Sequence, residues 1–125
     1  MERKIRIKVG EVEVLAELND SKVAGLIWDA LPFSASINTW GDEIYFPIPV
    51  KAKIDNPKTL VENGDLGYWP EGHAFCIFFG PTPISSKGEI RPASSVEIIG
   101  KLYGDPQEFK KVGPGENITL ERVTV

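Results

Sequence analysis

Aromatic side chains are concentrated in the middle of the chain, where they could bind an apolar ligand or fill a core. Residues 40–79 hold eight of the twelve aromatic residues. In the run Ala74–Phe79 apolar residues occupy both alternating faces, so one face fills an interior and the other must contact a helix, a loop or a ligand. Trp40 and Trp69 each adjoin a turn, where binding residues are common. These two tryptophans are therefore the preferred ligand contacts.

The single histidine, His73, follows the turn Pro70-Glu71-Gly72 and could serve as a general acid or base near neutral pH. An exposed turn residue is the simpler interpretation. A Ser-His-Asp triad would need one of the serines within residues 85–95, and none of them has the spacing of a nucleophile elbow. We therefore predict no catalytic residue from this pattern.

Cys76 is the only cysteine, which excludes an internal disulfide. Because it lies in an apolar run, we expect a small buried hydrophobic residue and not a nucleophile. The neighbouring acids Asp42 and Glu43 point to opposite sides if their segment is extended, and one histidine with one cysteine cannot complete a zinc site. We expect no metal and no cofactor.

The overall composition excludes several classes of partner. The 125 residues carry 14 basic and 18 acidic side chains, a net charge of −4, and no stripe of Lys and Arg interleaved with aromatics. Nucleic acid is therefore not an expected partner. Residues 1–10 alternate charged residues with Ile and Val, unlike a signal peptide, and the longest apolar run has six residues where a membrane span needs about twenty. We expect a cytoplasmic protein without a membrane span.

Short alternating runs between Gly, Pro, Asp and Asn predict an all-β protein with one domain over residues 1–125. Residues 3–18 have the pattern of a hairpin turning at Gly10, with basic side chains on one strand facing glutamates on the other. Residues 21–31 have the spacing of an amphipathic helix, and Asp105-Pro106-Gln107-Glu108 begins a second one. Further strands are expected at Ser34–Trp40, Glu43–Phe46, Val50–Ile54, Leu66–Trp69, Ala74–Phe79, Val96–Tyr103 and Glu116–Val125.

So many short antiparallel strands must close into a barrel or pair as a sandwich, because either arrangement removes exposed strand edges. Residues 80–95 hold three prolines and four serines without periodicity. A loop of that length in a small domain is usually functional or mobile, so it is the segment we expect to act as a lid.

Several motifs carry a family resemblance. Gly64–Gly72 with Phe75–Phe79, then Ile98–Leu102 with Lys110-Lys111-Val112, and the opening hairpin and helix with Ser36–Phe46 resemble segments of cyclophilins. Cyclophilins are prolyl isomerases built on an eight-stranded barrel capped by two helices. Over nearly the whole chain, Asn38–Phe46, Gly67-Tyr68-Trp69-Pro70 and Phe78–Pro83 more closely resemble short prokaryotic cyclophilin-like proteins of unassigned function. The resemblance implies a closed eight-stranded barrel with two short capping α-helices.

The usual isomerase residues are missing from the matching positions. A prolyl isomerase must lower a barrier of about 18–20 kcal/mol, and cyclophilins do so with a guanidinium donor and an apolar socket. The arginine of that family falls on Asn38 or its neighbour, and Asn38 donates only a neutral hydrogen bond. Its glutamine, socket phenylalanine and histidine fall near Ala74, Cys76 and Val96.

These observations predict a cyclophilin-like barrel that binds a small apolar or proline-containing ligand, such as an Xaa-Pro peptide, in an outer groove between residues 34–46 and 66–79. Two alternatives stay open: a weak or atypical peptidyl-prolyl cis-trans isomerase, and a module that docks on another protein. The oligomeric state is not indicated by any motif. The expected ligand-binding residues are Asn38 as the polar contact, Trp40, Phe46 and Trp69 as apolar walls, and His73 at the rim.

Overall fold

The chain opens with the hairpin that the alternating pattern predicts. The computed structural model describes residues 2–123. In it, β1 (Arg3–Val9) and β2 (Val12–Leu18) pair antiparallel around Gly10, whose φ of +57° is a conformation that glycine adopts at low steric cost. Lys8 lies opposite Glu13 in the register, and their charged groups are 3.9 Å apart. The hairpin and its cross-strand charge pairing are confirmed.

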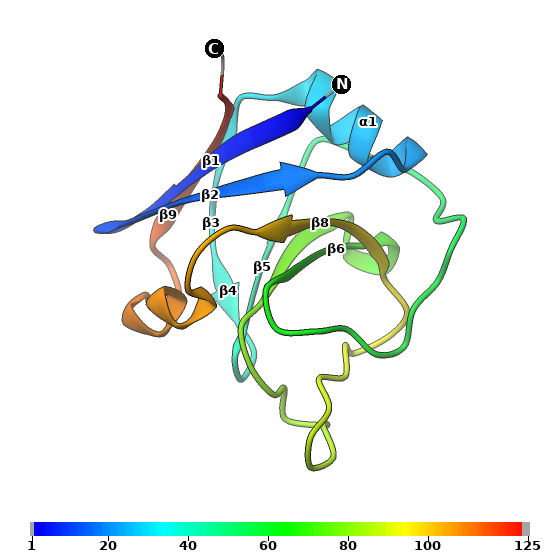
Figure 1. The fold of residues 1–125 in the computed structure, drawn as a ribbon, viewed down its shortest axis with the longest axis vertical. Coiled ribbons are helices and arrows are strands. Elements are labelled where there is room, and N and C mark those ends of the chain that lie inside the picture. The colour runs from blue at the N-terminus through cyan, green and yellow to red at the C-terminus, as the bar shows by residue number, and fades with distance from the viewer. Residues whose placement is uncertain (1, 124–125) are drawn as a thin grey trace.

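Across residues 2–123, nine antiparallel strands form one sheet that curls around a central core (Figure 1). Their order across the sheet is β3-β9-β1-β2-β8-β6-β7-β5-β4, and the predicted all-β class is confirmed. The last predicted strand ends earlier, at Arg122, and Thr124 and Val125 lie outside the described residues. The other strands are β3 (Phe33–Ser36), β4 (Asn38–Thr39), β5 (Glu43–Pro47), β6 (Asp65–Trp69), β7 (Ala74–Phe78), β8 (Glu97–Leu102) and β9 (Asn117–Arg122).

The barrel differs in detail from the closed eight-stranded barrel that the family resemblance implies. The two edge strands, β3 and β4, follow each other along the chain and are separated only by Ile37. β3 pairs with β9 whereas β4 pairs with β5, so one bent segment leads from one edge of the sheet to the other. Ile37 is buried, and its amide donates to the carbonyl of Glu116 at 2.9 Å. This bend divides the predicted strand Ser34–Trp40 and leaves a nearly closed barrel of nine described strands.

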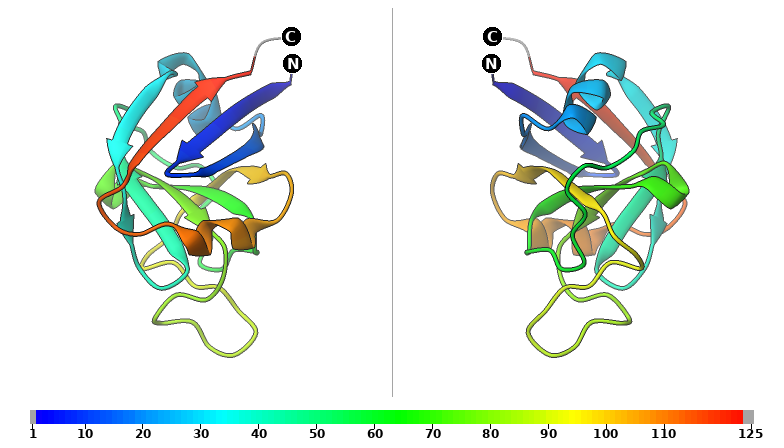
Figure 2. Two further views of the ribbon diagram at one scale, coloured as in Figure 1. Left: turned by 90° about the vertical axis from the view of Figure 1, so that its left-hand side faces the viewer. Right: turned by 90° about the vertical axis from the view of Figure 1, so that its right-hand side faces the viewer.

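The first predicted helix is present and lies at one end of the barrel, away from the long loop at the other end (Figure 2). It is α1 (Lys22–Ala30), and the hydroxyl of Ser21 caps it by accepting from the amide of Ala24 at 3.2 Å. Val23, Ala24 and Ile27 are buried, so this amphipathic face closes the core. In the described part of the chain, every helix falls short of the length and hydrophobicity needed to cross a membrane.

The second predicted helix is a 3₁₀ helix and not an α-helix. This segment, η2 (Pro106–Lys111), is capped by the side chain of Asp105 and ends with the amide of Val112 donating to the carbonyl of Phe109 at 3.3 Å. Hydrogen bonds between residues three apart suit so short a segment, because an α-helix of the same length would leave most of its backbone groups without partners. Phe109 is fully buried, with its ring centroid 6.0 Å from that of Phe79. A shorter 3₁₀ turn, η1 (Pro70–Gly72), follows β6.

The predicted strand Val50–Ile54 is wrong, because this segment pairs with no strand of the described sheet. The side chain of Tyr68 on β6 bonds to two of its backbone groups instead. The hydroxyl of Tyr68 donates to the carbonyl of Val50 at 2.7 Å and accepts from the amide of Ala52 at 3.2 Å. The segment is therefore tied to the barrel without belonging to the sheet.

The interior and the outer face of the barrel hold separate hydrophobic clusters, which explains the apolar residues on both faces of β7. Phe75 points inward and stacks on Phe46, with ring centroids 5.4 Å apart in the main core. The outward residues are covered by two connections, the one between β5 and β6 and the one between β7 and β8. These two connections pair with each other through an isolated β-bridge between Val61 and Ile90. Of the three alternatives expected for this second face, a helix, a loop or a ligand, loop segments cover it among the described residues. The outer cluster consists of Val61, Cys76, Phe78 and Val96.

Candidate functional site

A cavity of about 260 Å³ opens on the outer face of the barrel, next to the outer cluster. Strands β5 and β6 and the turn after β4 supply its aromatic walls, and the segment leading into β8 supplies the rest. Its lining is largely apolar and includes one acidic side chain. The lining residues are Trp40, Glu43, Tyr45, Trp69, Pro92, Ala93 and Val96.

The alternation of β5 determines which of its side chains reach the cavity. Successive side chains of a strand point to opposite faces, so Glu43 and Tyr45 lie on the outer face together. Ile44 and Phe46 point into the barrel and are fully buried there. The same strand therefore supplies both the core and the site.

A tight turn sets Trp40 beside Glu43. The amide of Trp40 donates to the carbonyl of Glu43 at 2.9 Å, and the amide of Glu43 donates back at 3.2 Å. Gly41 in this turn has φ +61°, and a Cβ there would lie 2.9 Å from the carbonyl oxygen of Pro81. Glycine is thus required at this position for two reasons, the left-handed backbone conformation and the close approach of the neighbouring loop.

Trp69 is held on several sides. Its ring meets that of Tyr45 edge to face, with centroids 6.1 Å apart and an interplanar angle of 84°. Its indole Nε1 donates to Ser94 Oγ at 2.6 Å, and the hydroxyl of Ser94 in turn donates to the carboxylate of Glu71. Gly72 lies against the ring so closely that a Cβ there would be 2.7 Å from it. The indole is therefore positioned before any ligand arrives.

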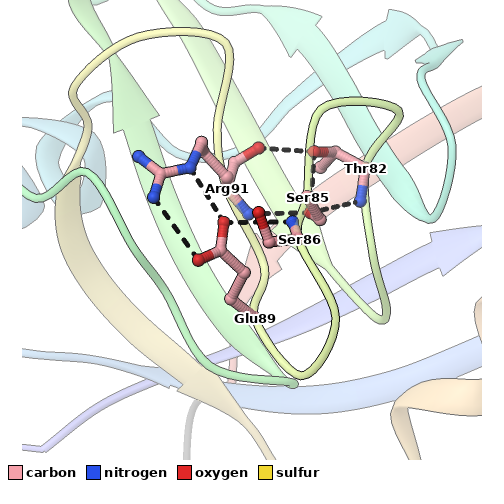
Figure 3. Close-up of polar contacts among 5 residues, drawn as sticks. All are labelled: Thr82, Ser85, Ser86, Glu89 and Arg91. Atoms are coloured by element: carbon pink, nitrogen blue, oxygen red, sulfur yellow. Dashed lines mark hydrogen bonds and ion pairs between the residues drawn. The ribbon is translucent and has the colours of Figure 1, made fainter.

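The long loop 80–95 forms one wall of the cavity and is held by its own hydrogen bonds (Figure 3). Ser85 Oγ accepts from the amides of Thr82 at 2.9 Å and Arg91 at 3.0 Å, and the hydroxyl of Thr82 donates to the carbonyl of Arg91. The guanidinium of Arg91 pairs with the carboxylate of Glu89 at 2.8 Å. These contacts join the two limbs of the loop and fix the point from which Pro92 enters the cavity wall.

Glu43 is the acidic residue of the cavity lining. The residue is 6% exposed, and burial raises the pKa of its carboxyl group from 4.5 to about 7. The thiol of Cys76 donates a hydrogen bond to this carboxyl and partly opposes the rise. Burial and the adjacent carboxyl raise the pKa of the Cys76 thiol well above its ordinary value, so it stays protonated. Of these two groups, only the carboxyl of Glu43 can gain or lose a proton near neutral pH.

Comparison with known proteins agrees with this fold. A family model described as cyclophilin-like matches residues 3–121. The chain belongs to the cyclophilin-like family. The solution structure of a hypothetical protein from Archaeoglobus fulgidus is similar to this cyclophilin-like chain, with 41% sequence identity and a TM-score of 0.82. The match covers 98% of this chain and 95% of that one, and a search of curated proteins finds no match.

Two of the five predicted contacts of this cyclophilin-like protein line the cavity, and one is wrong. Trp40 and Trp69 form part of the lining. Phe46 has no exposed surface and stacks on Phe75 in the main core, so it cannot form a wall of an outer groove. The reason is the two-residue period of β5, which places Phe46 on the face opposite to Tyr45.

The other two predicted contacts are exposed and lie outside the lining. Asn38 is directly opposite Tyr45 in the β4–β5 register, so its side chain lies on the same outer face, beyond the cavity. His73 ends the turn η1 with φ +46°, and its carbonyl accepts from the amide of Ile48 at 2.9 Å. Both roles stay predictions for a ligand that extends beyond the cavity.

Five lining residues were not predicted from the sequence. Glu43 and Tyr45 alternate with Ile44 and Phe46 on β5, and that signal was available, since the two apolar residues of the alternation fill the barrel core. Pro92, Ala93 and Val96 carry no such signal, because their place depends on how a long loop folds back over the sheet. Within residues 2–123, no group of three or more potential metal ligands lies together.

Proposed function

We propose that this cyclophilin-like protein is a binding protein that takes a small apolar or proline-containing ligand into the outer cavity. The observation that carries the proposal is the arrangement of three aromatic side chains around one space. Tyr45 and Trp69 meet nearly at right angles, and Trp40 adds a third ring from the turn. Rigid rings bind apolar groups with little loss of conformational entropy.

The volume of the cavity limits the ligand to a small group. At about 260 Å³ it is below the range of roughly 300–1,000 Å³ that is typical of pockets for larger organic ligands. A prolyl ring or a group of similar size fits this volume, whereas the rest of a longer ligand would cross the outer face. On that face the exposed Asn38 is available for a polar contact.

Binding is favoured over prolyl isomerisation because, among the described residues, the cavity lining has no positively charged group. Lowering a barrier of about 18–20 kcal/mol needs a strong donor at the prolyl nitrogen. Of the positions that correspond to isomerase residues, Ala74 and Cys76 are buried and Val96 is an apolar part of the wall. Asn38 offers a neutral amide only.

The test uses the three tryptophans as separate reporters in an NMR titration with a panel of Xaa-Pro peptides and small cyclic hydrocarbons. We expect the indole signals of Trp40 and Trp69 to shift on binding. Trp28 serves as the internal control, because it lies on α1 with the guanidinium of Arg122 5.0 Å from its ring centre. Unchanged Trp40 and Trp69 signals across the panel would contradict the proposal.

A protease-coupled isomerisation assay addresses the alternative activity. We expect no acceleration above the uncatalysed rate at high protein concentration. Acceleration that is lost in Asn38→Ala would favour the isomerase over the binding protein.

A further inference from the structure

The acidic residue of the cavity has no positively charged partner. In residues 2–123, no lysine, arginine or histidine forms an ion pair with Glu43. The partner that its carboxyl does have is the thiol of Cys76, a neutral and weak donor. Burying a carboxylate without a cation or strong donors is costly. A carboxyl at this position is therefore suited to receive a positive charge from outside the chain.

We propose that the cavity recognises an organic cation, an ammonium group carried on a small apolar body, with Glu43 as its counter-ion and the three aromatic rings as its walls. This inference rests on the proposed function, because it names the chemical class of the ligand for the same cavity. It adds a positive charge to the small apolar or proline-containing ligand already proposed.

The aromatic walls have the chemistry that such a group needs. The face of an aromatic ring is electronegative and attracts an ammonium ion, tryptophan most strongly. Tyr45 and Trp69 line the same cavity with their rings nearly perpendicular, and Trp40 adds the second tryptophan. The apolar lining removes water, which strengthens both the ring contacts and the attraction to a carboxylate.

The nearby basic residue does not compete for this place. Arg91 directly precedes the lining residue Pro92, yet its guanidinium is held by Glu89 at 2.8 Å (Figure 3). Arg91 does not line the cavity, and its positive charge is paired with Glu89. Glu43 thus keeps its free carboxyl for a ligand.

The elevated pKa of Glu43 supports the same conclusion. With a pKa of about 7, the carboxyl group is only partly ionised at neutral pH in the free protein. An ammonium group beside it favours the ionised form, so binding releases a proton. A neutral ligand of the same shape gains nothing from this carboxyl.

The experiment compares two probes that share a shape and differ in charge, choline and 3,3-dimethylbutan-1-ol. Calorimetric titration and the indole NMR signals report binding to the wild type, to Glu43→Gln, and to the control Glu13→Gln. Glu13 is an exposed carboxylate on β2, outside the cavity lining, so its replacement makes the same change of charge at a distance.

We expect the wild type to bind choline about tenfold or more tightly than the alcohol. Glu43→Gln should lower the choline affinity about tenfold and leave the alcohol affinity within about twofold. Glu13→Gln should change neither. If Glu43→Gln does not fold, the comparison of the two probes on the wild type decides by itself.

Equal affinity of the wild type for both probes would overturn the inference and leave the proposed binding function standing. The inference would also be overturned if Glu43→Gln bound choline as well as the wild type does. If neither probe but a prolyl peptide shifts Trp40 and Trp69, the cavity binds a neutral ligand and the cation is excluded. If no probe and no peptide shifts them, the proposed function fails as well.

Discussion

The thiol of Cys76 on β7 donates a hydrogen bond to the carboxyl group of Glu43 on β5. Glu43 is paired with Phe78 in the register and Tyr45 with Cys76, so the two bonded residues are diagonal neighbours on the outer face. Both are buried, one at the wall of the cavity and one beneath it. The relationship connects the stability of the outer cluster to the ionisation of the site.

The first prediction concerns the pH dependence of stability. The pKa of Glu43 is raised from 4.5 in an unfolded chain to about 7 in the folded one, so the folded state binds its proton more tightly. The contribution to the free energy of unfolding is fully present below about pH 4.5 and is lost as the pH rises through about 7. The loss amounts to up to about 3 kcal/mol by linkage.

Urea unfolding of the wild type and Glu43→Gln at pH 4.5 and pH 8 measures this contribution, because the difference between the two proteins isolates one group. We expect Glu43→Gln to gain stability relative to the wild type on going from pH 4.5 to pH 8. Parallel pH profiles of the two proteins would show that the carboxyl is not perturbed as described. Glu11→Gln, which removes an exposed carboxylate without an ion pair in residues 2–123, should follow the wild type.

A second prediction concerns the hydrogen bond itself. The thiol of Cys76 lowers the pKa of Glu43 against the larger effect of burial, so Cys76→Ala should raise that pKa above about 7. An NMR titration that follows the carboxyl carbon of Glu43 measures the change. Cys76→Ser, which keeps a donor at the same position, should not raise the pKa. A decrease in Cys76→Ala would mean that the thiol does not donate to this carboxyl.

A third prediction compares a core residue with a cavity residue that lies close to it in the sequence. Phe46 is fully buried against Phe75, so Phe46→Ala should lower the free energy of unfolding by about 3–5 kcal/mol. Trp40 is only partly buried and lines the cavity, so Trp40→Ala should cost less stability and should abolish ligand-induced shifts of Trp69. Denaturant unfolding of both variants provides the comparison. Equal losses would argue against the assignment of the two faces.

A fourth prediction tests the turn that positions Trp40. Gly41→Ala places a Cβ at φ +61° and 2.9 Å from the carbonyl oxygen of Pro81, and we expect a loss of about 1–3 kcal/mol in unfolding free energy. Gly113→Ala is the matched control, since nothing lies within 4 Å of its added Cβ. Its effect should stay within about 0.5 kcal/mol. The prediction fails if Gly41→Ala unfolds at the same denaturant concentration as Gly113→Ala.

Much of the fold could be predicted because it follows from local periodicity. Ile5, Ile7 and Val9 alternate with charged residues and form the inner face of the first hairpin. The helix at Lys22–Ala30 follows from its apolar spacing and its serine cap. Periodicity failed at Val50–Ile54, where the apolar residues contact the barrel without a strand partner. A pattern reports which side chains are buried but not which backbone supplies the hydrogen bonds.

The site was predicted only in part, since its residues come from four segments of the chain. Trp40 and Trp69 could be singled out because they adjoin turns, whereas Phe46 was assigned to the wrong face of its own strand. Glu43 could not be recognised as the altered acid, because the carboxyl is desolvated by elements distant in sequence.

By itself, the sequence determined the class of fold, the hairpin, the first helix and the two tryptophans of the cavity lining, Trp40 and Trp69. These properties depend on residues within a few positions of one another, and side-chain alternation and helical spacing are local rules. Only the tertiary structure decided that loop 80–95 would join β5 and β6 around a cavity, and that Glu43 would meet Cys76 inside an apolar layer. Burial and the pKa that follows from it depend on which surfaces meet in space, and no local pattern contains that information.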